Sequence, residues 1–211
     1  MKTGQLIDLL ANGAGQAPRV NPVLRLAPSI AIGVLAAALL SIGLLGLVPQ
    51  HMLGSPALWI KLAYAGSLAA AACWLVARLA LPLSHTEAPG AVLAAVAGGM
   101  ALLGLVALLA AAPGERLDAL LGRSWWRCPL IIPSVSLPAL GATLFTLRGL
   151  APTRLRQAGL AAGLLAGALG AMGYSLHCAE ESLAFVALWY SLGILATGAL
   201  GALLGPRTLR W

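Results

Sequence analysis

Long apolar runs separated by short breaks dominate the sequence. Six of these runs come close to the roughly twenty residues that an α-helix needs to cross a bilayer. They lie at Leu26–Val48, Ala57–Ala77, Ala91–Ala112, Cys128–Leu147, Ala158–Leu176 and Leu183–Leu204. The breaks between them carry proline and glycine, which interrupt regular structure. The pattern therefore predicts an all-α membrane protein with six transmembrane helices.

The first 25 residues form the only sizeable segment outside the apolar runs. Thr3 can cap a short helix, and Leu6, Ile7 and Leu10 share one face of it as an apolar stripe. A helix this short is marginal in water on its own, so the stripe needs a surface to bury it: the bilayer, the bundle itself or a partner. We predict two parts, residues 1–25 as an N-terminal helix with a linker and residues 26–211 as a six-helix membrane domain.

Composition and charge agree with this fold class. The 211 residues are 60% hydrophobic and 9% charged, against about 25% charged in soluble domains, which excludes a water-soluble fold. The net charge of +7 is spread over short loops and forms no basic patch, so no direct binding to nucleic acid is expected. No run carries Asp, Glu or Arg at mid-depth, which disfavours an ion-coupled transporter.

The basic residues also predict the orientation. With the N-terminus inside, nine of them face the cytoplasm and four face the other side. The inner set is Lys2, Arg19, Arg25, Arg78, Arg148, Arg154, Arg156, Arg207 and Arg210, and the outer set is Lys61, Arg116, Arg123 and Arg127. The positive-inside rule then predicts a multi-pass protein with both termini, and hence the short N-terminal helix, in the cytoplasm.

Two of the three cysteines are predicted to lie at the same depth. Cys128 precedes the loop Arg148–Arg156 by twenty residues, and Cys178 follows that loop by twenty-two. At about 1.5 Å per residue, both lie about 30 Å from the loop. Because the loop is short, the two helices are expected to be antiparallel neighbours, with both cysteines at the outer boundary. Cys73 lies deep in the second run and is interpreted as a small buried residue.

The residues around Cys178 leave two chemistries open. An oxidising periplasm permits a Cys128–Cys178 disulfide, and the two thiols with His177 suit a soft metal ion such as copper or zinc. Glu180 and Glu181 are interpreted as solvated loop carboxylates, although one of them could orient His177. No C-x-x-C motif is present, which argues against a thioredoxin-like site.

Two further patterns concern packing. Pro133 and Pro138 interrupt the fourth run and predict either a simple kink or an open vestibule at its outer end. Gly159, Gly163 and Gly167 stand four residues apart in the fifth run, which is typical of closely approaching helices. We expect this glycine ridge to pack within one monomer rather than to form a dimer interface, although a homo-oligomer remains compatible with the sequence.

Short motifs along nearly the whole chain resemble the NrsF family, six-helix inner-membrane anti-sigma factors of proteobacteria. They are Met1-Lys2-Thr3-x-x-Leu6-Ile7, Trp125-x-x-Cys128 with the prolines after it, Arg148-Gly149-Leu150-Ala151-Pro152-Thr153-Arg154, Tyr174-Ser175-Leu176-His177-Cys178-Ala179-Glu180-Glu181-Ser182, Trp189-Tyr190-Ser191-Leu192-Gly193 and Leu209-Arg210-Trp211. The resemblance implies a regulator rather than an enzyme, with no required cofactor. Its N-terminal segment would hold an extracytoplasmic-function sigma factor, with the Leu6, Ile7 and Leu10 stripe as the predicted contact. Cys128 and Cys178 would sense metal or oxidative stress and release that partner.

Composition and spacing alone leave other function classes open. A membrane protein that handles thiols or metals could act at the same cysteines, and a structural subunit of a larger complex would have the same spans. An enzyme should keep its activity without the N-terminal segment, whereas a sequestering protein should lose its function. A structural subunit should be indifferent to the cysteines.

Overall fold

The predicted helices are present in the computed structural model, which describes residues 3–13, 21–81, 85–150 and 152–210. Within these ranges every regular element is helical: α1 (Thr3–Gly13), α2 (Pro22–Leu45), η1 (Gln50–Met52), α3 (Pro56–Leu79), α4 (Glu87–Ala110), α5 (Arg116–Leu121), α6 (Cys128–Arg148), α7 (Leu155–Ser175), α8 (Leu183–Phe185), η2 (Val186–Tyr190) and α9 (Ser191–Thr208). Helices α2, α3, α4, α6 and α7 and the continuous segment Leu183–Thr208 are long and apolar enough to cross a membrane. The prediction of six such helices after a short N-terminal helix is confirmed. Most of the predicted linker (residues 14–20), Lys2 and Trp211 lie outside the described residues.

Helix α2 begins four residues before the predicted start at Leu26. Pro22 occupies its first turn, where a missing backbone N–H costs nothing, and the side chain of Asn21 accepts a hydrogen bond of 3.1 Å from the backbone N–H of Val23. These capping residues precede the apolar run, so a prediction made from the apolar residues alone places the start of α2 too late.

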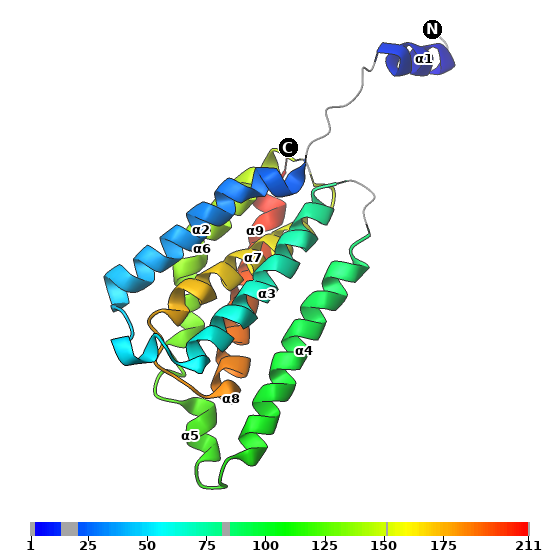
Figure 1. Cartoon of the computed structure of the whole chain (residues 1–211). Helices are drawn as coiled ribbons and strands as arrows, with labels where there is room; N and C mark the ends of the chain where they lie inside the picture. The colour runs from blue at the N-terminus through cyan, green and yellow to red at the C-terminus, as the bar shows by residue number, and fades with distance from the viewer. Residues whose placement is uncertain (1–2, 14–20, 82–84, 151, 211) are drawn as a thin grey trace.

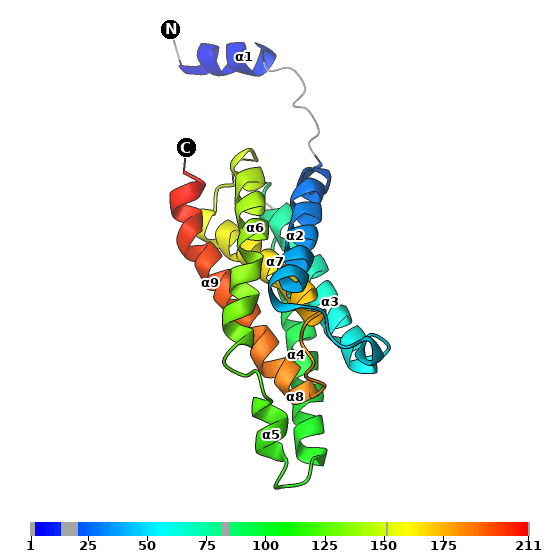
Figure 2. The ribbon, with the colours of Figure 1, turned by 90° about the vertical axis from the view of Figure 1, so that its left-hand side faces the viewer.

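Helix α7 forms the centre of the bundle and packs against α2, α3, α6 and α9 (Figures 1 and 2). It is the most buried of the membrane-length helices. Its glycine ridge faces α9: a Cβ added at Gly163 would meet the Thr197 carbonyl and lie 2.8 Å from the Cα of Gly198. The ridge therefore packs within the monomer, as predicted, and lets the two backbones touch.

The prolines of α6 do not break the helix. The helix continues through Pro133 and Pro138 to Arg148, and the hydroxyl of Ser136 donates a hydrogen bond of 2.6 Å to the carbonyl of Ile132. The helix is therefore continuous, and an open cavity still lies beside its outer end, lined by Arg127 and by the neighbouring loops.

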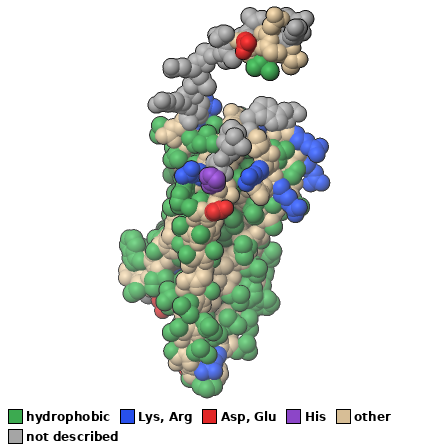
Figure 3. Space-filling model, turned by 90° about the vertical axis from the view of Figure 1, so that its right-hand side faces the viewer, with side chains coloured by type: hydrophobic (Ala, Val, Ile, Leu, Met, Phe, Trp, Pro, Cys, Tyr) green, Lys and Arg blue, Asp and Glu red, His purple; other side chains and the backbone are tan. Residues whose placement is uncertain are grey.

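The two ends of the bundle differ. The C-terminus and α1 lie at one end, while α5, α8 and the loop between α2 and α3 lie at the other (Figure 1). On the face shown in Figure 3, basic side chains gather near the first end and hydrophobic side chains cover the length below it. We call the second end, which carries Cys128 and Cys178, the cysteine end.

Candidate functional site

The two cysteines of the predicted site lie against each other. Cys128 is the first residue of α6, and Cys178 lies in the loop after α7. Both are free thiols with side chains 0% and 5% exposed, and the Cys128 thiol is within hydrogen-bonding reach of the Cys178 sulfur. The expected proximity is therefore found, and the structure adds that both side chains are buried.

Local backbone bonds place each cysteine. Helix α7 ends at Ser175, but the N–H groups of His177 and Cys178 still donate to the carbonyl of Tyr174, at 3.0 and 3.1 Å. Cys178 therefore lies one helical turn beyond Tyr174, on the same side. The N–H of Cys128 likewise donates to the carbonyl of Ser124 at 3.1 Å, which fixes the start of α6 to the turn before it.

Two buried tyrosines enclose the sulfurs. The rings of Tyr174 and Tyr190 lie 5.9 Å apart between centroids. The Tyr174 hydroxyl reaches Cys128, and the Tyr190 hydroxyl points toward Cys178. No hydrogen bond of normal geometry within the described residues satisfies the Tyr190 hydroxyl.

The second tyrosine lies on the η2 segment, a π-helical turn in the last span. Such wide turns add a residue to the helix and often occur at functional sites. The neighbouring residue, Trp189, donates a hydrogen bond of 2.9 Å to the carbonyl of Leu120 at the end of α5. The turn therefore directs Tyr190 toward the sulfurs and Trp189 toward α5.

A buried lysine lies beside the pair. Lys61 of α3 is 2% exposed, and its Nζ donates a hydrogen bond of 2.7 Å to the carbonyl of Cys178. The pKa of Cys178 is lowered to about 6, first because the Cys128 thiol donates to its sulfur and also because the charge of Lys61 is close; burial acts in the opposite direction. The arrangement favours a thiolate at Cys178, the form that reacts with electrophiles and binds metals.

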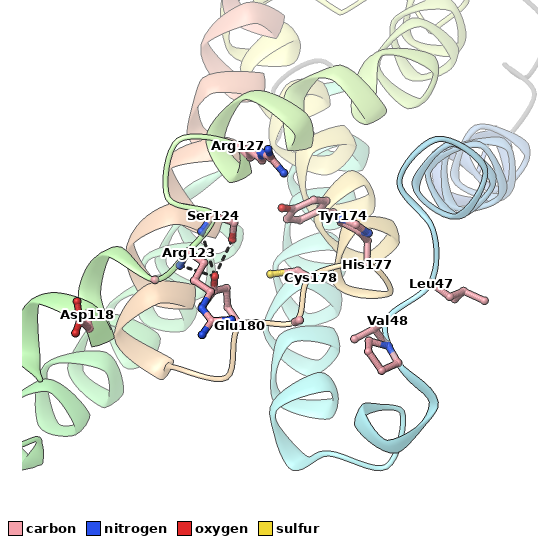
Figure 4. Close-up of a pocket in the computed structure, with 13 residues that line it drawn as sticks. Leu47, Val48, Asp118, Arg123, Ser124, Arg127, Tyr174, His177, Cys178 and Glu180 are labelled. Carbon is pink, nitrogen blue, oxygen red and sulfur yellow. Dashed lines mark hydrogen bonds between the residues drawn. The ribbon is translucent and has the colours of Figure 1, made fainter.

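The two glutamates of this loop differ, and the interpretation of Glu180 as a solvated carboxylate is wrong. Its Oε1 accepts hydrogen bonds from the N–H of Arg123 at 2.8 Å and from the N–H and hydroxyl of Ser124, each at 3.1 Å. Glu181 is exposed and accepts one bond of 3.2 Å from Ser55. Figure 4 shows the Glu180 carboxylate between its own loop and the turn before α6.

An open cavity of about 860 Å³ reaches the site from the cysteine end. Cys178 lines it, together with loop residues around Val48 and Arg123 (Figure 4), whereas fully buried Cys128 lies behind. A small solute can therefore reach Cys178 first.

His177 does not join the sulfurs in this conformation. Its Nδ1 lies 3.0 Å from the carbonyl of Gly46, facing the loop between α2 and α3. Among the described residues, no group of three or more His, Cys, Asp or Glu side chains is arranged to hold a metal ion. The two adjacent thiols suit a soft metal, but a metal site formed by Cys128, Cys178 and His177 stays a prediction.

Sequence reasoning missed four residues of this site: Lys61, Tyr174, Glu180 and Tyr190. Two of them carried a usable signal. Lys61 is a lone cation inside an apolar run, and such residues mark functional sites more often than random positions do. Tyr174 precedes Cys178 by four residues, which is the spacing of neighbours on one helical face.

The predicted partner contact lies at the other end of the chain. Leu6, Ile7 and Leu10 of α1 are 45%, 60% and 64% exposed, and α1 stands apart from the bundle (Figure 2). The apolar stripe is therefore not buried against the six-helix domain.

Comparisons with known proteins place the chain in a family. The family model NrsF, described as "Negative regulator of sigma F", matches residues 10–211. The chain is 41% identical to a "Probable anti-sigma-F factor NrsF" of Azospira oryzae and 40% identical to an "Anti-sigma-F factor NrsF" of Caulobacter vibrioides, each over 215 aligned positions that cover all of both chains. No solved structure matches the chain significantly. The resemblance found in the motifs is thus confirmed over the full length, and the chain belongs to the NrsF family.

Proposed function

We propose that this protein is a membrane-bound anti-sigma factor that sequesters an extracytoplasmic-function sigma factor. The observation that carries the proposal is the full-length similarity to two proteins named anti-sigma-F factors. The exposed stripe of α1 supports it, because an apolar face that the bundle does not cover suits a protein partner. The protein acts as a regulator and needs no catalytic group.

The proposed orientation in the membrane follows from the location of the sigma factor that α1 binds. A sigma factor is cytoplasmic, so α1 must lie in the cytoplasm, and the basic side chains near this end are consistent with that side. The cysteine end then faces the periplasm. A reporter fused after residue 211 should behave as cytoplasmic; a periplasmic C-terminus would contradict both the orientation and the sensor model.

The Cys128–Cys178 pair is proposed to be the sensor. Oxidation would join the two sulfurs, and a soft metal ion would be held by the two thiolates. A disulfide requires Cα atoms within about 7 Å, whereas a bridging metal tolerates a wider gap. Either event must stabilise one arrangement of α6 and α7 over another, because a ligand with equal affinity for both shifts nothing. The sigma factor is released when the favoured arrangement no longer presents α1 for binding.

The experiment that tests sequestration changes the stripe. The double variant Leu6→Asp with Leu10→Asp places two charges on the contact face, so sigma-dependent transcripts should rise without stress and the sigma factor should no longer copurify with the membrane protein. The matched control, Gly4→Asp with Gln5→Asp, adds the same charge to the opposite face of α1 and should repress normally. Full repression by the stripe variant would show that α1 is not the contact.

A further inference from the structure

We propose that Glu180 is a positioning residue for the cysteine pair: it ties the loop that carries Cys178 to the turn that leads into Cys128, and so holds the two thiols in contact. This inference rests on the proposed function only in naming the pair as the sensor. The contact between Glu180 and the turn before Cys128 does not depend on a sigma factor.

The Glu180 carboxylate bridges two segments far apart in the sequence, its own loop and the turn at Arg123 and Ser124. We call this set of hydrogen bonds the clasp. One oxygen, Oε1, accepts three hydrogen bonds of 2.8 to 3.1 Å from Arg123 and Ser124. Two of the three donors are backbone N–H groups, so the bonds fix the path of the chain and not merely a side chain. Hydrogen bonds to a carboxylate are also about twice as strong as those between neutral groups.

The turn on the other side of the clasp is shaped to receive the carboxylate. Gly122 has φ of 56°, a conformation that favours glycine. A Cβ added there would lie 2.7 Å from Oε2 of Glu180 and 2.8 Å from the ring of Phe185. The clasp therefore uses the space that a side chain at position 122 would fill.

The clasp is close to both sulfurs along the chain. Glu180 follows Cys178 by two residues, and its partner Ser124 accepts the backbone N–H of Cys128 at 3.1 Å. A loosened clasp would free the loop and the start of α6 to move separately, which would part the thiols. The adjacent Glu181 has the same charge but is exposed and takes part in one bond to Ser55, so it provides a matched control.

The test measures how readily the two thiols form a bond. The full chain carrying Cys73→Ser is purified in detergent and treated with diamide, which accepts the two hydrogen atoms that the thiols lose as the sulfurs join. Mass spectrometry follows the Cys128–Cys178 disulfide over time. The variants are Glu180→Ala, Glu180→Gln and Glu181→Ala, and the thermal unfolding midpoint of each is recorded in the reduced state.

We expect Glu180→Ala to slow disulfide formation by at least about tenfold, because it removes three hydrogen bonds to a charged group and one such bond already corresponds to a factor of about ten. Glu180→Gln should be intermediate, because its amide oxygen still accepts from the two N–H groups without the charge. Glu181→Ala should react at the parent rate. Partial rescue by glutamine separates positioning from a general loss of stability.

Two results would overturn the inference: an unchanged rate in Glu180→Ala, or equal slowing in the two alanine variants. If Glu180→Ala does not yield folded protein, Ser124→Ala removes the hydroxyl bond to Glu180 without altering charge, and it should slow the reaction by up to about tenfold. An unchanged rate in Ser124→Ala would also overturn the inference. No sigma factor takes part in the assay, so a failed sequestration experiment leaves this outcome unaffected.

Discussion

The glycine ridge of α7 allows a quantitative test of the fold that positions the cysteines. In Gly163→Ala the added Cβ would press on the Thr197 carbonyl and lie 2.8 Å from the Cα of Gly198. Both neighbours are backbone atoms, so no rotamer change can relieve the contact. Helices α7 and α9 must move apart.

The magnitude combines two opposing effects. Overpacking of a close-packed interior costs about 1–3 kcal/mol, and a backbone-to-backbone clash belongs at the upper end of this range. Alanine in place of glycine raises the free energy of unfolding by up to about 1 kcal/mol, because alanine has the higher helix propensity. We therefore expect Gly163→Ala to lower the free energy of unfolding by about 2 kcal/mol.

A second glycine provides the control. Gly99 of α4 is exposed and has no atom within 4 Å of an added Cβ, so Gly99→Ala should gain stability by up to about 1 kcal/mol. Unfolding of the purified protein by titration with a denaturing detergent, followed by circular dichroism, compares the two variants. The predicted difference between them is about 3 kcal/mol. Equal stabilities would refute the claim that the α7 and α9 backbones touch.

Three further predictions concern the site. Cys128→Ser and Cys178→Ser should each repress a sigma-dependent reporter but no longer respond to stress, and the double variant should be no worse, whereas Cys73→Ser should respond normally; a clear difference between the two single variants would contradict the paired site. Lys61→Met leaves the buried carbonyl of Cys178 without its donor and should lower the free energy of unfolding by about 1–3 kcal/mol, an effect that the same change at exposed Arg156 should not reproduce. The lowered pKa means that half of the Cys178 thiolate is protonated only near pH 6; its alkylation rate should therefore fall to half of its plateau near that pH, and a half-maximal rate near the ordinary thiol pKa would exclude the effect.

The helical architecture could be predicted from the sequence because each apolar run must satisfy its backbone hydrogen bonds internally once it lies in a bilayer. Run lengths and breaks therefore predicted the spans that became α2, α3 and α4. The depth of Cys128 and Cys178 followed in the same way, since the rise per residue of a helix is nearly constant. The intramolecular packing of Gly163 was also predictable, because residues four apart form a continuous ridge.

The sequence by itself thus determined that six helices are long and apolar enough to cross a membrane and that two thiols lie at the same end of them. Only the tertiary structure decided that the thiols face each other, because the rotation of a helix about its axis depends on every neighbour it packs against. The roles of Lys61 and Glu180 also needed the fold. Their partners, Cys178 and the turn at Ser124, lie 117 and 56 residues away in the chain, and no local pattern connects groups at such separations.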